Sequence, residues 1–238
     1  MKNTIVRKVA TLEQLLGICN AHGASYTPSK ASIQPTALRS LLELAQQKTE
    51  AVNVTRSVYA LAVNARQQSF AGLPKLAAQI TRIAAASEAS LRDKEDARMV
   101  RRKFYSVRKK KSEVMADTQA GKAPAPKGAR STSSLDRGSM MENFQYLIQL
   151  VQNIPGYNPS EVEFKVETLK SVLGDLRTRC QAVAKAATDV SNARIARDQV
   201  IFGPDGVVES SSAARDYIRG KFGVVSRQTQ QAMQSGNF

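Results

Sequence analysis

The chain contains few side chains that could form a catalytic or metal-binding site. The only histidine is His22, in a predicted turn, so neither a serine–histidine catalytic pair nor a multi-histidine metal site is expected within one chain. The two cysteines, Cys19 and Cys180, are too few for a disulfide framework. Both occupy positions where apolar helix residues are expected, which favours small buried side chains in a reducing compartment. We therefore expect neither a metal ion nor a cofactor.

Two short stretches offer candidate catalytic groups, and each has a simpler interpretation. Residues 106–109 spell S-x-x-K, a spacing that pairs a serine nucleophile with a lysine. A four-residue match inside a basic run arises easily by chance. Asp93, Glu95 and Asp96 could supply carboxylates for acid–base catalysis, but on a helix they are expected to form a solvated face. We predict no catalytic residues and a protein that is not an enzyme.

The stretch KEDARMVRRKFYSVRKKK has the pattern of a basic amphipathic helix. On a helix its apolar residues Ala97, Val100, Phe104 and Val107 lie on one side, opposite the basic residues. Arginine and lysine neutralise phosphates and make binding salt-dependent, and a tyrosine can stack on a base. The predicted contacts with nucleic acid or another anion are Arg98, Arg101, Arg102, Tyr105, Arg108, Lys109, Lys110 and Lys111. The alternative interpretation is a solvated face of a helical bundle.

The basic residues are concentrated in one part of the chain. The net charge is +15 and the isoelectric point is about 10.1. Between residues 98 and 130 there are eleven lysines and arginines against two acids, Glu113 and Asp117. Such a charge balance favours nucleic acid, an anionic membrane surface or an acidic protein as partner.

A second group of polar residues recurs near the end of both long helical patterns. It comprises Asn192, Arg194 and Arg197 in the second pattern and Asn64 and Arg66 in the first. Arg194 takes the next seam position after an apolar series, where a charge needs a partner. We expect a buried or half-buried ion pair or hydrogen bond between helices. A clamp for an anion or another ligand is the alternative.

The elements that would position these residues are long helices. From Val162 onward, apolar residues alternate in steps of four and three, the seven-residue period of a supercoiled helix seam. We predict one long helix over residues 160–198 and a second, less regular one over 36–68. The seam consists of Val162, Val166, Leu169, Leu173, Leu176, Cys180, Val183, Ala187 and Val190.

The chain also repeats itself. YTPSKASIQPTALRSLL begins at Tyr26 and YNPSEVEFKVETLKSVL begins at Tyr157, a shift of 131 residues. Ser29 and Ser160 are predicted to be the N-caps of the two long helices. With a three-residue gap, the Asn-Ala-Arg run 64–66 matches the run 192–194. We interpret these matches as an internal duplication.

The predicted fold class is therefore all-α, an internally duplicated helical bundle. Residues 1–111 form the first unit and 140–225 the second, each opening with a short helix (11–21 and 141–153) and closing with another after a turn (74–87 and 208–221). Residues 112–139, rich in Ser, Ala, Pro, Gly and Lys, are predicted to be a flexible linker. The polar tail 226–238 is predicted to be loose.

Three runs of this chain resemble a family of helical proteins from Bacteroidota. They are SMMENFQYLIQLVQNIPGYNPSEVEFKVETLKSVLGDL, SNARIARDQVIFGPDGVV and AARDYIRGKFG. The resemblance covers most of residues 139–223 and, more weakly, 11–111. It implies a duplicated helical domain type and carries over no activity.

The sequence thus predicts a non-enzymatic structural or scaffolding protein that acts through helix packing, against itself or against a helical partner. The alternative is a nucleic-acid-binding protein that uses residues 98–130. No stretch approaches the roughly 20 apolar residues of a membrane span, and we expect a cytoplasmic location.

Overall fold

The computed structural model describes residues 2–105, 136–223 and 226–234, and every regular element in these ranges is helical. The predicted all-α class is therefore confirmed. The α-helices are α1 (Lys2–Ala21), α2 (Pro35–Ala71), α3 (Leu73–Ala86), α4 (Leu91–Arg102), α6 (Arg137–Asn153), α7 (Val166–Phe202), α8 (Val207–Phe222) and α9 (Arg227–Gln234). Three short 3-10 helices are η1 (Gly23–Ser25), η2 (Ala31–Ile33) and η3 (Val162–Phe164).

The order of these helices shows the internal duplication. Helices α2 and α7 are both 37 residues long. Each follows a shorter helix and a 3-10 turn, and each precedes two further helices. The shift of 131 residues carries Pro35 onto Val166 and Ala71 onto Phe202, so the two long helices correspond without a gap.

The repeated Tyr-x-Pro-Ser stretch forms a loop, not a helix start. The hydroxyl of Tyr26 donates to the carbonyl of Ile33, and the hydroxyl of Tyr157 donates to the carbonyl of Phe164. The prediction that Ser29 caps a helix is wrong, as is that for Ser160, because a 3-10 turn intervenes and the long helices begin at residues 35 and 166.

The described residues form two compact units. The first unit takes its residues from 1–61 and 184–238, and the second from 62–183. These units differ from the predicted units, 1–111 and 140–225. At 1.5 Å per residue a helix of 37 residues is about 55 Å long, too long for both its ends to share one compact core. Each unit therefore contains the opening helix of one repeat and the closing helices of the other.

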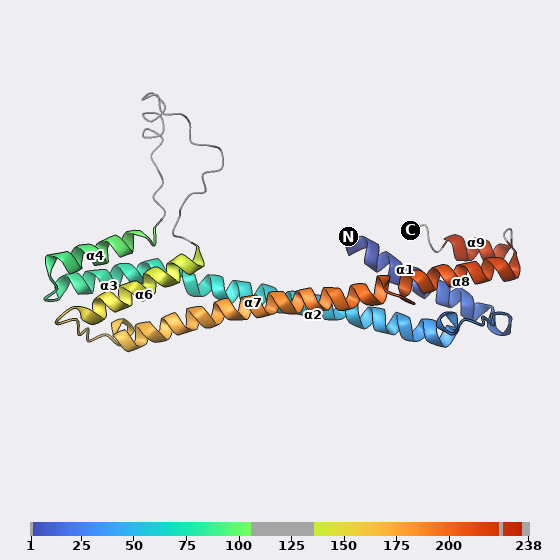
Figure 1. Cartoon of the computed structure of the whole chain (residues 1–238), viewed down its shortest axis with the longest axis horizontal. Helices are drawn as coiled ribbons and strands as arrows, with labels where there is room; N and C mark the ends of the chain where they lie inside the picture. The colour runs from blue at the N-terminus through green and yellow to red at the C-terminus, as the bar shows by residue number, and fades with distance from the viewer. Residues whose placement is uncertain (1, 106–135, 224–225, 235–238) are drawn as a thin grey trace, which may run out of the picture. The chain divides into compact units, whose positions relative to one another are not determined.

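In the first unit, α1 packs against α8 and α9, and α8 also contacts η2 (Figure 1). Spacing at three and four residues puts the apolar side chains of α1 on one face, which is buried. The buried core draws on α1, the start of α2, the end of α7, α8 and α9. Its largest fully buried side chains are Leu12, Leu15, Leu38, Ile201 and Ile218.

In the second unit, α3 packs against α4 and α6, and α4 also packs against α6 (Figure 1). Helix α3 begins with Pro74 in its first turn, where the missing N–H costs no hydrogen bond. The end of α2 and the start of α7 complete this core. Its largest fully buried side chains are Leu73, Ile80, Phe104, Phe144, Leu147, Leu169 and Leu176.

The seam of α7 follows the heptad pattern only in part. Leu169, Leu173 and Leu176 are buried as predicted. Val162 is 65% exposed because it lies in η3, before the helix begins. Further along, Ala186 is buried in place of the predicted Ala187. From Ala184 onward α7 belongs to the first unit, so its buried face there is set by other helices than in the second unit.

Two helical segments near the ends of the chain were not predicted from the sequence. Helix α1 begins at Lys2 instead of Thr11, because Ile5 reaches the first core. The tail predicted to be loose contains α9, whose Thr229 N–H donates to the hydroxyl of Ser226 at 3.2 Å. Ala232 of α9 is buried against the first core.

Most of the predicted linker 112–139 lies outside the described residues, as do residues 106–111. Its last residues are helical. The carboxylate of Asp136 caps α6, accepting from the N–H groups of Gly138 at 2.8 Å and Ser139 at 3.3 Å. Helix α6 therefore begins at Arg137, before the predicted unit boundary at residue 140.

Residues 203–206 form the turn that joins α7 to α8. A Cβ atom on Gly203 would lie 2.3 Å from the carbonyl oxygen of Gln199, so glycine is required there. Lys30 reaches this turn from the η2 loop and pairs with Asp205 at 3.0 Å. This ion pair raises the pKa of Lys30 and lowers that of Asp205.

Candidate interaction surfaces

The basic helix predicted from the sequence corresponds in part to α4, which ends at Arg102, so Phe104 and Tyr105, predicted to be helical, lie in the turn after it. Ala97 and Val100 are buried, as is Phe104 just after the helix, whereas Arg98 and Arg102 are exposed. The helix thus buries its apolar stripe in the second core and presents basic side chains on its outer face. Arg101 is half-buried. Arg108, Lys109, Lys110 and Lys111 lie outside the described residues.

The predicted base-stacking residue has an internal contact. Tyr105 is 48% exposed, but its hydroxyl donates to the carbonyl of Pro74 at 3.0 Å. This hydrogen bond ties the end of α4 to the start of α3. Tyr105 can therefore be part of the basic surface only while its hydroxyl is held by this bond.

Of the three carboxylates considered for acid–base chemistry, Asp93 has a structural role at the start of α4, while Glu95 is exposed and Asp96 is half-buried. The N–H of Asp93 donates to the Ser90 hydroxyl at 3.1 Å, and the N–H of Ser90 donates to the Asp93 carboxylate at 3.3 Å. This reciprocal pair is a capping box, which satisfies two helix-end donors. Asp93 is thereby engaged in holding the helix end.

The structure corrects the prediction for Arg194. This residue was expected to continue the α7 seam and to hold a buried partner, but it is exposed, as is Asn192. In this part of α7, which belongs to the first unit, the inward positions are Ala193 and Arg197, which are half-buried, and Ile201, which is buried. The side chain of Arg197 is only 15% exposed and pairs with the neighbouring Asp198 at 2.7 Å.

The counterpart residues in α2 do not occupy equivalent positions. Because the long helices correspond without a gap, Asn64 matches Ile195 and not Asn192. Asn64 is exposed and Arg66 is half-buried. The Nε of Arg66 is buried and has no hydrogen-bond partner. The two Asn-Ala-Arg runs therefore differ in their surroundings.

Arg194 and Arg197 do share a pocket, in the first unit. Its volume is about 370 Å³. Arg56 of α2 also faces it, a residue that sequence reasoning missed because it is a single basic residue within a long helix. The remaining lining residues include one acid, Asp198, and two apolar side chains. The full lining is Thr4, Ile5, Arg56, Arg194, Arg197, Asp198 and Phe202.

An apolar stripe on α2 faces solvent in the described structure. Val54, Val58 and Leu61 are 52%, 51% and 68% exposed. Their spacing of four and three residues places them on one face of the helix. We refer to these three residues as the α2 stripe.

The duplicated helix provides an internal comparison for the α2 stripe. With the shift of 131 residues, its counterparts in α7 are Lys185, Asp189 and Asn192. All three are exposed. Polar residues thus occupy the corresponding helix positions in one copy of the repeat, and apolar residues occupy them in the other. The duplicated fold itself does not require apolar side chains there.

Cys19 and His22, the other side chains that could take part in chemistry, pack against neighbouring residues. Cys19 is fully buried, and burial raises the pKa of its thiol. The His22 ring lies 4.9 Å from the ring of Phe222. Within residues 2–105, 136–223 and 226–234, no group of three or more His, Cys, Asp or Glu side chains could hold a metal ion.

Comparison with known proteins adds no functional information. No protein-family model, no curated protein and no solved structure matches the chain. The resemblance to a Bacteroidota family thus receives no support from these comparisons. Among the described helices, none has both the length and the apolar character needed to cross a membrane.

Proposed function

We propose that this protein is a non-enzymatic structural or scaffolding protein that associates with a second copy of itself through the α2 stripe. The observation that carries the proposal is the contrast between the two copies of the repeat. Val54, Val58 and Leu61 are exposed at positions where α7 has Lys185, Asp189 and Asn192. Exposed apolar side chains that recur on one helix face are typical of a packing surface.

A second copy suits this stripe because it is self-complementary. In a twofold dimer the same patch meets itself, so each valine or leucine of one chain would cover apolar side chains of the other. Fully burying one such side chain is worth about 1.5–3 kcal/mol. An apolar contact of this kind persists at high salt, since it does not depend on charge.

The protein's own repeat supplies the test. The triple variant Val54→Lys, Val58→Asp and Leu61→Asn gives α2 the residues that α7 carries at the same positions. Size-exclusion chromatography with light scattering should report a wild-type mass above the 25.9 kDa of one chain. The triple variant should elute as a monomer with unchanged helical circular dichroism.

A matched control is Leu91→Asn, which removes a leucine that is 83% exposed but lies outside the stripe. It should leave the mass of the assembly unchanged. A wild-type protein that stays at 25.9 kDa at all concentrations would contradict self-association. Equal loss of assembly in Leu91→Asn would show that general surface hydrophobicity, and not the stripe, drives it.

A second candidate function is nucleic-acid binding by the basic segment 98–130. The observation in its favour is that α4 exposes Arg98 and Arg102 while burying Ala97 and Val100. Binding of this kind should weaken steeply with salt, because neutralised phosphates release counterions. Electrophoretic mobility shifts at two salt concentrations, with Arg98→Gln/Arg102→Gln as the comparison, test it directly. Assembly through the α2 stripe would survive the higher salt.

We propose that the protein acts in the cytoplasm, and its two free thiols support this location. Cys19 is buried and Cys180 is half-buried, and both are free. Free cysteines suit a reducing compartment. Alkylation in intact cells before lysis should label Cys180 as a thiol, whereas recovery of this residue as a mixed disulfide would argue for an oxidising compartment.

A further inference from the structure

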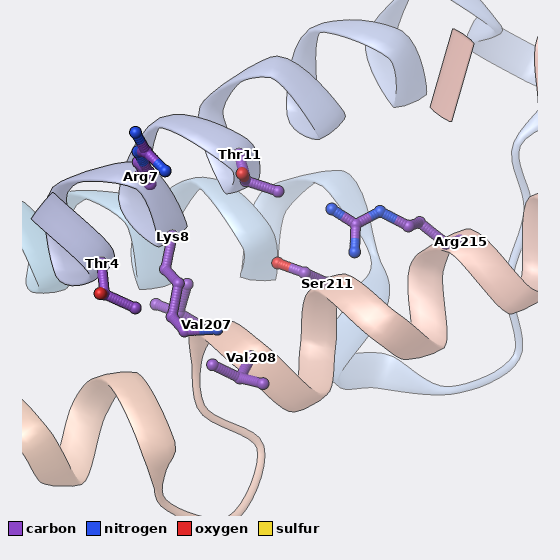
Figure 2. A pocket seen from close by; sticks show the side chains of 8 residues that line it. All are labelled: Thr4, Arg7, Lys8, Thr11, Val207, Val208, Ser211 and Arg215. Atoms are coloured by element: carbon purple, nitrogen blue, oxygen red, sulfur yellow. The ribbon is translucent and has the colours of Figure 1, made fainter. Parts of the chain in front are cut away.

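A second basic pocket in the first unit lies between α1 and α8, and its function does not follow from helix packing. Its volume is about 250 Å³. In Figure 2, Lys8 of α1 and Ser211 and Arg215 of α8 extend toward the space between the two helices. The lining consists of Thr4, Arg7, Lys8, Thr11, Val207, Val208, Ser211 and Arg215.

All the charged residues that line this pocket are basic. Arg7 and Lys8 reach it from α1, and Arg215 reaches it from α8, whereas none of the eight lining residues is an aspartate or glutamate. The α1 residues recur at the helical spacing of one face, so the arrangement follows from how α1 packs on α8. A cation would be repelled here, and an anion would be attracted.

Two buried polar groups of the pocket lack a hydrogen-bond partner. The hydroxyl of Ser211 is unpaired although this residue is only 4% exposed. One terminal nitrogen of the Arg215 guanidinium is likewise buried and unpaired. Leaving such groups without a partner is costly, so a ligand that accepts hydrogen bonds from both would remove a penalty that the fold carries.

A hydrogen bond to α9 holds the Arg215 side chain in place. Its Nε donates to the carbonyl of Ala232 in α9 at 3.2 Å. Burial lowers the pKa of this guanidinium, but arginine stays charged at any physiological pH. The side chain is therefore a charged donor held in place before any ligand arrives.

The amino end of α8 adds further donors. Val207 and Val208 are the first residues of this 16-residue helix. The N-cap residue, Gly206, has no side chain that could accept from the first-turn N–H groups. Glu209 is engaged elsewhere: its carboxylate accepts from the N–H of Asp205 at 3.0 Å and pairs with Lys30 at 3.5 Å. Neither the N-cap residue nor Glu209 therefore accepts from the first-turn N–H groups, which leaves them available to a ligand at a helix end that carries a partial positive charge.

We propose that the pocket between α1 and α8 binds a phosphate group, with Ser211 and Arg215 as buried donors and Arg7 and Lys8 as charges at its entrance. Phosphate matches this donor set because its several oxygens can accept from guanidinium, hydroxyl and backbone N–H groups together. Inorganic phosphate, a nucleoside monophosphate and a nucleic-acid strand all carry this group, and binding measurements separate them.

The experiment is isothermal titration calorimetry of the full chain with inorganic phosphate, at an ionic strength held constant with sodium chloride. Saturable binding and a higher melting temperature in phosphate than in chloride are expected. Ser211→Ala removes a charge-assisted hydrogen bond and Arg7→Gln removes a positive charge at the entrance, and each should weaken phosphate binding about tenfold. Because Arg7 is exposed, its variant should fold normally.

Arg219→Gln is the matched control. This arginine lies one turn after Arg215 on the same helix but does not line the pocket, so its loss should leave phosphate affinity unchanged. Parallel titrations with a nucleoside monophosphate and with an oligonucleotide lacking a terminal phosphate identify the source of the group. The proposal is supported if at least one of these three ligands binds the wild-type protein and binds Arg7→Gln more weakly.

Two outcomes overturn it. One is that none of the three ligands gives a signal beyond that of chloride. The other is that binding is lost in Arg98→Gln/Arg102→Gln but unaffected by Arg7→Gln and Ser211→Ala, which would assign the anion to the surface of α4. Neither outcome bears on self-association through the α2 stripe.

Discussion

The hydroxyl of Tyr26 donates a hydrogen bond to the carbonyl oxygen of Ile33, seven residues later, at 2.9 Å. Tyr157 makes the same bond to Phe164, also at 2.9 Å. In both places the tyrosine closes a loop that ends in a 3-10 turn and leads into a 37-residue helix. The repeated tyrosine and proline are thus explained by the loop they build.

Removing either hydroxyl should destabilise the protein. Tyr26→Phe and Tyr157→Phe leave a loop carbonyl without its partner, at a cost of about 1–2 kcal/mol each. Urea denaturation followed by circular dichroism gives the change in free energy of unfolding. The control is Tyr146→Phe, since Tyr146 is 47% exposed and its loss should cost little. Equal small effects for all three tyrosines would show that the loop bonds contribute nothing.

The same tyrosines predict a sensitivity to alkaline pH. Burial raises the pKa of Tyr157 from its usual 10.0 to about 12. The folded state therefore binds this proton more tightly than the unfolded state. The resulting stabilisation is complete below pH 10 and is lost as the pH rises from about 10 to about 12. Burial raises the pKa of Tyr26 as well.

Denaturation of wild type and Tyr157→Phe across this range checks the effect, because other titrating groups are common to both proteins. The free energy of unfolding of wild type should fall more steeply with pH, so the difference between the two proteins should shrink above pH 10. A constant difference would show that the Tyr157 hydroxyl does not titrate abnormally.

The existence of the long helices and of the duplication could be predicted from the sequence, because both depend on local patterns. The spacing of Leu169, Leu173 and Leu176 identifies a buried helix face whatever lies against it. The same pattern does not identify which helix packs against this buried face. A seam residue is apolar whether it meets a helix of its own repeat or of the other, so the composition of the two units was not predictable from the pattern.

The helices and turns that were missed depend on tertiary contacts. Residues 2–10 carry a mixed basic and apolar pattern, and α1 extends over them because Ile5 reaches the first core. Helix α9 has few apolar residues, and its buried Ala232 and Thr229 decide its position. The pocket between α1 and α8 joins Arg7 to Arg215, which are far apart in the chain. No local spacing relates two such residues.

Leu173 tests whether the α7 seam carries stability. It is 6% exposed within the second core. Leu173→Ala should therefore cost about 2–5 kcal/mol of unfolding free energy. The control is Val162→Ala, at a predicted seam position that is 65% exposed, which should cost less than about 0.5 kcal/mol. If both substitutions prove neutral in urea denaturation, the buried face of α7 does not hold the second unit together.

The last prediction contrasts two arginines of α7. Arg194 is exposed, so Arg194→Ala should change the free energy of unfolding by only about 0–0.5 kcal/mol. The side chain of Arg197 is 15% exposed and pairs with Asp198, which is 47% exposed. Solvent around Asp198 screens this pair, so the main loss in Arg197→Ala is the packing of the aliphatic stem, about 1 kcal/mol. Urea denaturation of both variants distinguishes them. A loss above about 2 kcal/mol for Arg194→Ala would mean that its guanidinium holds a buried partner, as the heptad pattern had suggested.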